Sequence, residues 1–171
     1  MVRYRNGCTR TRALGLALAF AGMSACSRPD PPTASGEGGW LAGTVDQKLE
    51  TVAKQLRGFD MAMAETGYRY NELYWAAQDD NWGYADYQVK KIRTAVENGL
   101  QRRPKRAPSA ETFLKVMLPA IEEAITRRDS ALLRERIGAL RSTCNACHQA
   151  EKVEFVHVGV PQVRPFTANP Q

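Results

Sequence analysis

Two cysteines and a histidine near the C-terminus are the residues of this sequence whose spacing could do chemistry. Cys144 and Cys147 are separated by two residues, and His148 follows immediately. Thiols at this spacing could bind a metal ion, cycle as a redox dithiol, or form thioether bonds to the two vinyl groups of one haem. In the third case the adjacent imidazole would be the proximal ligand of the iron.

The remaining cysteines and histidine help to choose among these three chemistries. A zinc site requires about four ligands, and His157 is the one further histidine in the sequence. A redox dithiol is typical of a helix N-terminus that follows a strand, whereas this pair follows a long helical pattern. We therefore predict one covalently bound haem c, with Cys144 and Cys147 as its anchors and His148 as iron ligand. The zinc and dithiol alternatives stay open.

Residues 1–25 have the pattern of an export signal. They contain Arg3, Arg5, Arg10 and Arg12 and no acidic residue, and an uncharged apolar stretch runs from Ala13 to Ala25. As a helix that stretch is ~20 Å long, short of the ~30 Å hydrocarbon core of a bilayer. A cleaved signal peptide is therefore expected in place of a membrane span.

The end of this segment, Met23-Ser24-Ala25-Cys26, resembles a bacterial lipobox. The resemblance implies that Cys26 is lipidated, and Ser27 after it implies sorting to the outer membrane. An ordinary secretory signal, which would release a soluble periplasmic protein, is the alternative. Residues 26–43 are rich in proline and glycine and predict a flexible tether. We expect a lipid-anchored protein on the periplasmic side of a bacterial membrane.

The charge of the chain does not favour nucleic acid as a partner. The formal net charge is +6, but residues 1–25 carry four of the arginines, and without them the acidic and basic residues nearly balance. A basic stretch remains between positions 90 and 106, which is either a solvated surface or a docking patch for an acidic redox partner. Its members are Lys90, Lys91, Arg93, Arg102, Arg103, Lys105 and Arg106.

Apolar residues recur at helical spacing from residue 44 to residue 152, which predicts four amphipathic helices. The first extends from Thr44 to about Ala77 with a bend. The second extends from Trp82 to Pro104, and Asp79-Asp80-Asn81 offers its N-cap. Ser109 is the expected N-cap of the third, in which Pro119 should cause a kink or leave a carbonyl free. Short links between amphipathic helices predict an all-α, antiparallel four-helix bundle. Residues 153–171 are expected to be an extended tail, lying across the bundle or fraying.

The fourth helix, capped by Asp129 or Ser130, connects this fold to the predicted site. Its apolar stripe of Leu133, Ile137 and Leu140 continues through Cys144 and Cys147, with His148 beside them. The haem would therefore lie inside the bundle. For the sixth iron position we consider Met63, which lies on the stripe of the first helix, ahead of Met61, which does not. The other candidates are His157, Met117 and an open or water-filled site.

A haem-attachment motif at the end of the last predicted helix of a four-helix bundle resembles the cytochrome c′ family. That family often has a basic residue four positions after the ligand histidine, and Lys152 stands there. The resemblance covers residues 44–152 and implies an open sixth iron position and, in many members, a homodimer. Residues 73–82 and Cys144–Phe155 also resemble a broader group of small exported monohaem cytochromes.

The sequence contains no arrangement typical of an enzyme. It lacks a second histidine paired with an acid for peroxide chemistry, a Ser/His/Asp set and a phosphate-binding loop. We therefore expect a periplasmic electron carrier that exchanges single electrons with redox partner proteins and is held at the membrane by its lipid. The alternative is a five-coordinate haem protein that binds diatomic gases such as NO or CO.

Overall fold

The computed structural model describes residues 34–164, and the expected signal peptide and Cys26 lie outside this range. The chain divides into two compact units, Met1–Thr44 and Val45–Gln171. In the first unit, the described residues form the short 3-10 turn η1 (Glu37–Gly39), closed by an isolated β-bridge between Ser35 and Leu41. Among the described helices, none has the length and apolar character needed to cross a membrane.

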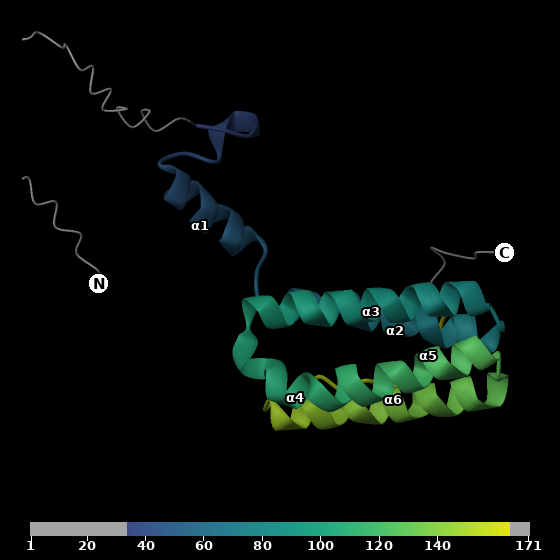
Figure 1. The fold of residues 1–171 in the computed structure, drawn as a ribbon. Helices are drawn as coiled ribbons and strands as arrows, with labels where there is room; N and C mark the ends of the chain where they lie inside the picture. Colours follow the sequence, from purple (N-terminus) through teal and green to yellow (C-terminus); the bar gives the residue numbers. More distant parts are fainter. Residues whose placement is uncertain (1–33, 165–171) are drawn as a thin grey trace, which may run out of the picture. The chain divides into compact units, whose positions relative to one another are not determined.

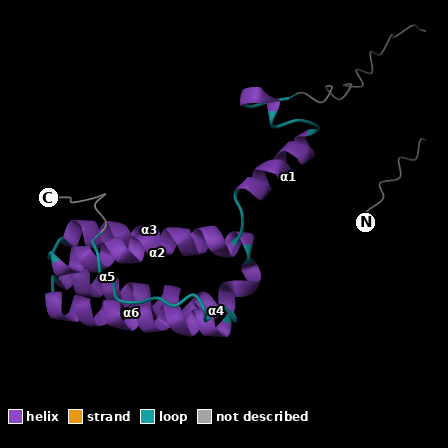
Figure 2. Cartoon of the chain, turned by 180° about the vertical axis from the view of Figure 1, so that it is seen from behind, coloured by secondary structure: helices purple, strands orange, loops and turns teal. Residues whose placement is uncertain are grey.

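The second unit is built from helices. Helix α2 packs against α3, and α5 packs against α6. Contacts of α3 with α5 and of α2 with α6 join these two pairs (Figures 1 and 2). A 3-10 turn, η2 (Pro104–Arg106), precedes α4, and a π-helical turn, η3 (Phe113–Met117), connects α4 to α5. The α-helices are α1 (Val45–Gln55), α2 (Phe59–Gln78), α3 (Trp82–Arg102), α4 (Ala107–Thr112), α5 (Leu118–Arg127) and α6 (Ser130–Ala150).

Two of the predicted helix starts are confirmed at the level of their caps. The Asn81 side chain accepts a hydrogen bond from the Tyr84 amide at 3.1 Å and caps α3. The Asp129 side chain accepts from the Leu132 amide at 3.0 Å and caps α6. Each cap satisfies an amide that has no partner within the helix. The apolar stripes of the last three predicted helices also face the core, and their fully buried members include Ala85, Val89, Ile92, Ile121, Leu133 and Leu140.

The prediction of one continuous helix from residue 44 to residue 77 is wrong. The helix is interrupted between α1 and α2, where Arg57 adopts a left-handed conformation with φ of 58°. The amide of Gly58, the N-cap residue of α2, then donates to the Asp60 side chain at 3.0 Å. As a result α1 has no buried residue, and its apolar Val45 and Leu49 are exposed.

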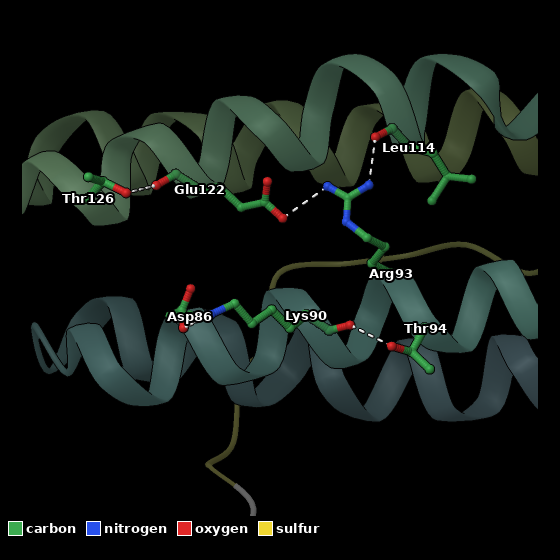
Figure 3. A network of polar contacts seen from close by, with 7 residues as sticks. All are labelled: Asp86, Lys90, Arg93, Thr94, Leu114, Glu122 and Thr126. Carbon is green, nitrogen blue, oxygen red and sulfur yellow. Dashed lines mark hydrogen bonds and ion pairs between the residues drawn. The ribbon is translucent and has the colours of Figure 1, made fainter.

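Next to Pro119, where the sequence predicted a kink or a free carbonyl, the helix contains the π-helical turn η3. The Leu118 amide donates to the Phe113 carbonyl, five residues earlier. Pro119 has no N–H to continue this pattern toward Leu114, and the Arg93 guanidinium of α3 donates to the Leu114 carbonyl at 3.1 Å (Figure 3). A side chain from a neighbouring helix thus supplies the donor that proline lacks.

Ser109 is not the N-cap that the sequence predicted. Helix α4 begins earlier, at Ala107, because Pro108 is tolerated in the first turn, where its missing N–H removes no helical hydrogen bond. Ser109 therefore lies inside the first turn of α4.

Candidate functional site

An apolar cavity opens beside the two cysteines and the histidine. Its volume is about 720 Å³ with its open mouth included. Helices α2, α3, α4 and α6, the π turn and the tail all contribute to its walls. The lining residues are Phe59, Met63, Thr66, Gly67, Tyr70, Val96, Ala110, Phe113, Cys144, Cys147, His148, Val156 and Val158.

Cys144 and Cys147 lie on α6 as free thiols that both face this cavity. Burial, with a smaller contribution from Cys147, raises the pKa of Cys144 to about 12. Burial also raises the pKa of Cys147, opposed by a hydrogen bond with Ser109. Reactive dithiols instead have a lowered thiol pKa. The surroundings of this pair therefore do not resemble those of a redox dithiol.

His148 is half-buried and lies beside the cysteines at the cavity wall. Its Nδ1 atom is 2.5 Å from the carbonyl oxygen of Val156 in the tail. Because a carbonyl oxygen can only accept, Nδ1 is the atom that carries hydrogen, and the neutral ring then has its lone pair on Nε2. A histidine that ligates a metal commonly makes such a bond to a backbone carbonyl through its other nitrogen.

The tail after α6 covers part of the same site. The Asn145 side chain, one residue after Cys144, donates from Nδ2 to the Val158 carbonyl at 3.0 Å. The Val158 amide donates back to Asn145 Oδ1 at 2.8 Å. The Tyr70 hydroxyl donates to the Gly159 carbonyl at 3.3 Å. These bonds hold the tail so that Val156 and Val158 line the cavity.

A second polar contact joins the end of α6 to the start of α4 near Cys147. The Glu151 carboxylate accepts from the Ser109 hydroxyl and from the Arg106 guanidinium. Arg106 also lies over the Phe59 ring, 5.6 Å from its centroid. The elements on either side of the cysteines are therefore connected by side chains as well as by packing.

These residues fit a haem by their character. The cavity is apolar, it is open to solvent, and two thiols and an imidazole with a directed lone pair stand at one wall. Gly67 stands at the mouth, and a Cβ added there would have no atom within 4 Å, so this part of α2 leaves space open. Across residues 34–164, no cluster of three or more His, Cys, Asp or Glu side chains is placed to hold a metal ion.

The candidates for a second iron ligand differ in whether they line the cavity. Met63 lines the cavity from α2. Met61 is exposed on another face of that helix, and His157 is exposed in the tail. Met117 is half-buried against the core and does not line the cavity. Of the four, Met63 shares the cavity with Cys144 and His148.

The aromatic residues between positions 68 and 87 and the basic stretch between positions 90 and 106 contribute one lining residue to the cavity. Tyr70 lines the cavity, whereas the other aromatic residues between positions 68 and 87 do not. In the basic stretch, Lys90, Arg93 and Arg106 form ion pairs with acidic side chains of the same fold. These three cations are therefore partly neutralised as partners for an acidic protein.

Sequence reasoning did not identify Val156, Val158 or Asn145 as part of the site. Asn145 occupies a position that the attachment motif leaves variable, and its partner Val158 lies 13 residues away. The one local signal was the return of valines at alternate positions after Lys152. Comparison of the chain with family models, with curated proteins and with solved structures finds no match.

Proposed function

We propose that this chain is an exported monohaem c-type cytochrome that transfers single electrons in the periplasm. Cys144 and Cys147 would hold the porphyrin through thioether bonds, and His148 would ligate the iron through Nε2. The bound haem would supply an iron that changes oxidation state by one electron. The observation that carries the proposal is the hydrogen bond from His148 Nδ1 to the Val156 carbonyl, at the wall of an apolar cavity that both cysteines share.

The packing of the helices supports the finer part of the proposed fold, an antiparallel four-helix bundle of the cytochrome c′ kind. In this proposal α2, α3, the combined segment from α4 to α5, and α6 are its four rods. The tight turns between α2 and α3 and between α5 and α6 agree with it. The apolar walls would exclude water from the ring, which favours the less charged state of a redox centre.

The lipid anchor at Cys26 is part of this proposal and rests on the sequence. An acylated Cys26 followed by residues 27–43 would keep the helical unit near the membrane while leaving it exposed to redox partners. Mass determination of the mature N-terminus tests it, since the acyl chains add their own mass. An unmodified Cys26 would contradict this part alone.

Haem attachment is tested by expression of the full chain in bacteria that carry a haem c maturation system. Haem should remain with the protein after denaturation and give the absorption of a thioether-linked haem. Cys147→Ala should lose or weaken this covalent link, and His148→Ala should alter the spectrum of the iron. Ser142→Ala, an exposed change on the same helix, is the matched control and should keep its haem. Normal haem content in both site variants would refute the proposal.

A second candidate function, diatomic gas binding, is favoured by the character of the cavity. The two hydroxyl groups of the cavity lining already donate hydrogen bonds to backbone carbonyls, Thr66 to that of Ala62 and Tyr70 to that of Gly159. The remaining lining from α2 and α3 is apolar apart from the Met63 sulfur. Absorption spectra of wild type and Met63→Ala, with and without CO, separate the two functions. If wild type does not bind CO and Met63→Ala does, Met63 is an iron ligand and the result supports electron transfer. Equal binding of CO by both indicates the gas-binding function.

A further inference from the structure

The chain reverses its direction directly after α6, which brings the tail back to the histidine. The Lys152 amide donates to the Gln149 carbonyl at 3.1 Å, and the Val153 amide donates to the His148 carbonyl at 2.8 Å. Lys152 itself is left-handed, with φ of 59°. This pair of bonds is the Schellman pattern of a helix C-terminus. It directs the tail along α6 toward residues one turn earlier.

The returning tail is held most firmly at Val158. The Asn145 amide group makes both hydrogen bonds that the Val158 backbone can offer, at 2.8 and 3.0 Å, and both are partly buried. Besides the contact of His148 with Val156, the other polar contacts of the tail with the helices are longer or more exposed. The bond from Tyr70 is 3.3 Å long, and the ion pair of Arg164 with Asp79 is exposed. Asn145 is therefore the side chain that joins α6 to the tail through two partly buried hydrogen bonds.

We propose that Asn145 is a positioning residue that clamps the tail and so holds His148 in its Nδ1–H tautomer. The clamp fixes Val158, two residues after Val156, and the Val156 carbonyl then accepts the hydrogen of Nδ1 at 2.5 Å. Without the clamp, the tail could leave the histidine, and the ring would exchange between its two tautomers in water. The motif Cys144–His148 thus contains its own means of orienting its histidine.

The consequence for an iron ligand rests on the proposed function. A backbone carbonyl that accepts from Nδ1 makes the imidazole a more basic ligand and stabilises the more highly charged iron. Loss of the clamp should then raise the reduction potential. We expect the ratio of oxidised to reduced protein to change by up to about tenfold, which is ~59 mV for a one-electron couple.

The first measurement is the tautomer of His148 in the full-length chain without haem, from its imidazole ¹⁵N chemical shifts. Wild type should show a protonated Nδ1 and an unprotonated Nε2. Asn145→Ala should shift the ring toward the Nε2–H form, and Asn145→Asp should fall between, because it keeps the acceptor for the Val158 amide. Gln149→Ala, an exposed change on the same helix, is the control and should match wild type.

The second measurement is the reduction potential of the haem-loaded protein and its Asn145→Ala variant. An unchanged tautomer and an unchanged potential in this variant would overturn the proposal while leaving haem binding intact. A wild type whose main form is Nε2–H would overturn it as well. If Asn145→Ala loses helicity by circular dichroism, Asn145→Asp decides by the same tautomer measurement. Failure of haem to attach refutes the proposed function alone, because the tautomer is read without haem.

Discussion

The contact of Arg93 with the π turn gives the most direct test of the packing beside the cavity (Figure 3). Arg93→Met keeps the apolar stem and removes the guanidinium. The lost hydrogen bond to the Leu114 carbonyl is worth about 0.5–1.5 kcal/mol. The ion pair with Glu122, at 2.9 Å with both side chains about one-third exposed, adds only about 0.2–1 kcal/mol after allowance for solvent. We expect the free energy of unfolding to fall by about 1–2 kcal/mol in total.

Urea denaturation of a double-mutant cycle separates the two contributions. Glu122→Gln alone and together with Arg93→Met gives the coupling between these side chains, expected to be about 0.2–1 kcal/mol. The rest of the loss belongs to the Leu114 carbonyl. Lys90→Met is the matched control on the same helix, since it breaks only an exposed ion pair with Asp86. If the coupling with Glu122 accounts for the whole loss, the carbonyl is not a significant partner and the account of the π turn is wrong.

Three further predictions concern the helix contact, the helix end and the tail. Gly99→Ala should reduce the free energy of unfolding by about 1–3 kcal/mol in urea denaturation, because the new Cβ would lie 2.7 Å from the Cβ of Ala62. Lys152→Gly should raise it by about 0.5–1 kcal/mol, since the penalty for a left-handed residue exceeds the extra freedom of glycine in the unfolded chain. The hydrogen bond from Arg164 holds the pKa of Asp79 below its usual range. The stabilising contribution of the Asp79 carboxylate should therefore be complete above the ordinary aspartate pKa. It should be lost as the pH falls through the lowered pKa of Asp79. NMR titration of the Asp79 carboxyl tests this, and Arg164→Gln should return the pKa to the usual range.

Local patterns in the sequence predicted the described helices best where a cap or a stripe is encoded within a few residues. Asn81 and Asp129 begin α3 and α6 because each side chain bonds an amide three residues ahead. The same logic failed at Arg57, where the apolar period continues but the backbone turns left-handed. It also failed at Ser109, since the preceding residues already form the first turn. A periodic pattern records which face is apolar but carries little information on whether the backbone continues.

The residues that could do chemistry at the candidate site were determined by the sequence alone, because the type and spacing of Cys144, Cys147 and His148 are covalent properties of the chain. What surrounds them was decided by tertiary structure. The cavity joins α2 and α6 with a tail that returns through a left-handed Lys152, and the lone pair of His148 is directed by a carbonyl eight residues later. Such contacts depend on how separate segments pack, and no local spacing specifies them. The physical reason is that a hydrogen bond between segments forms only after the helices have fixed the positions of both partners.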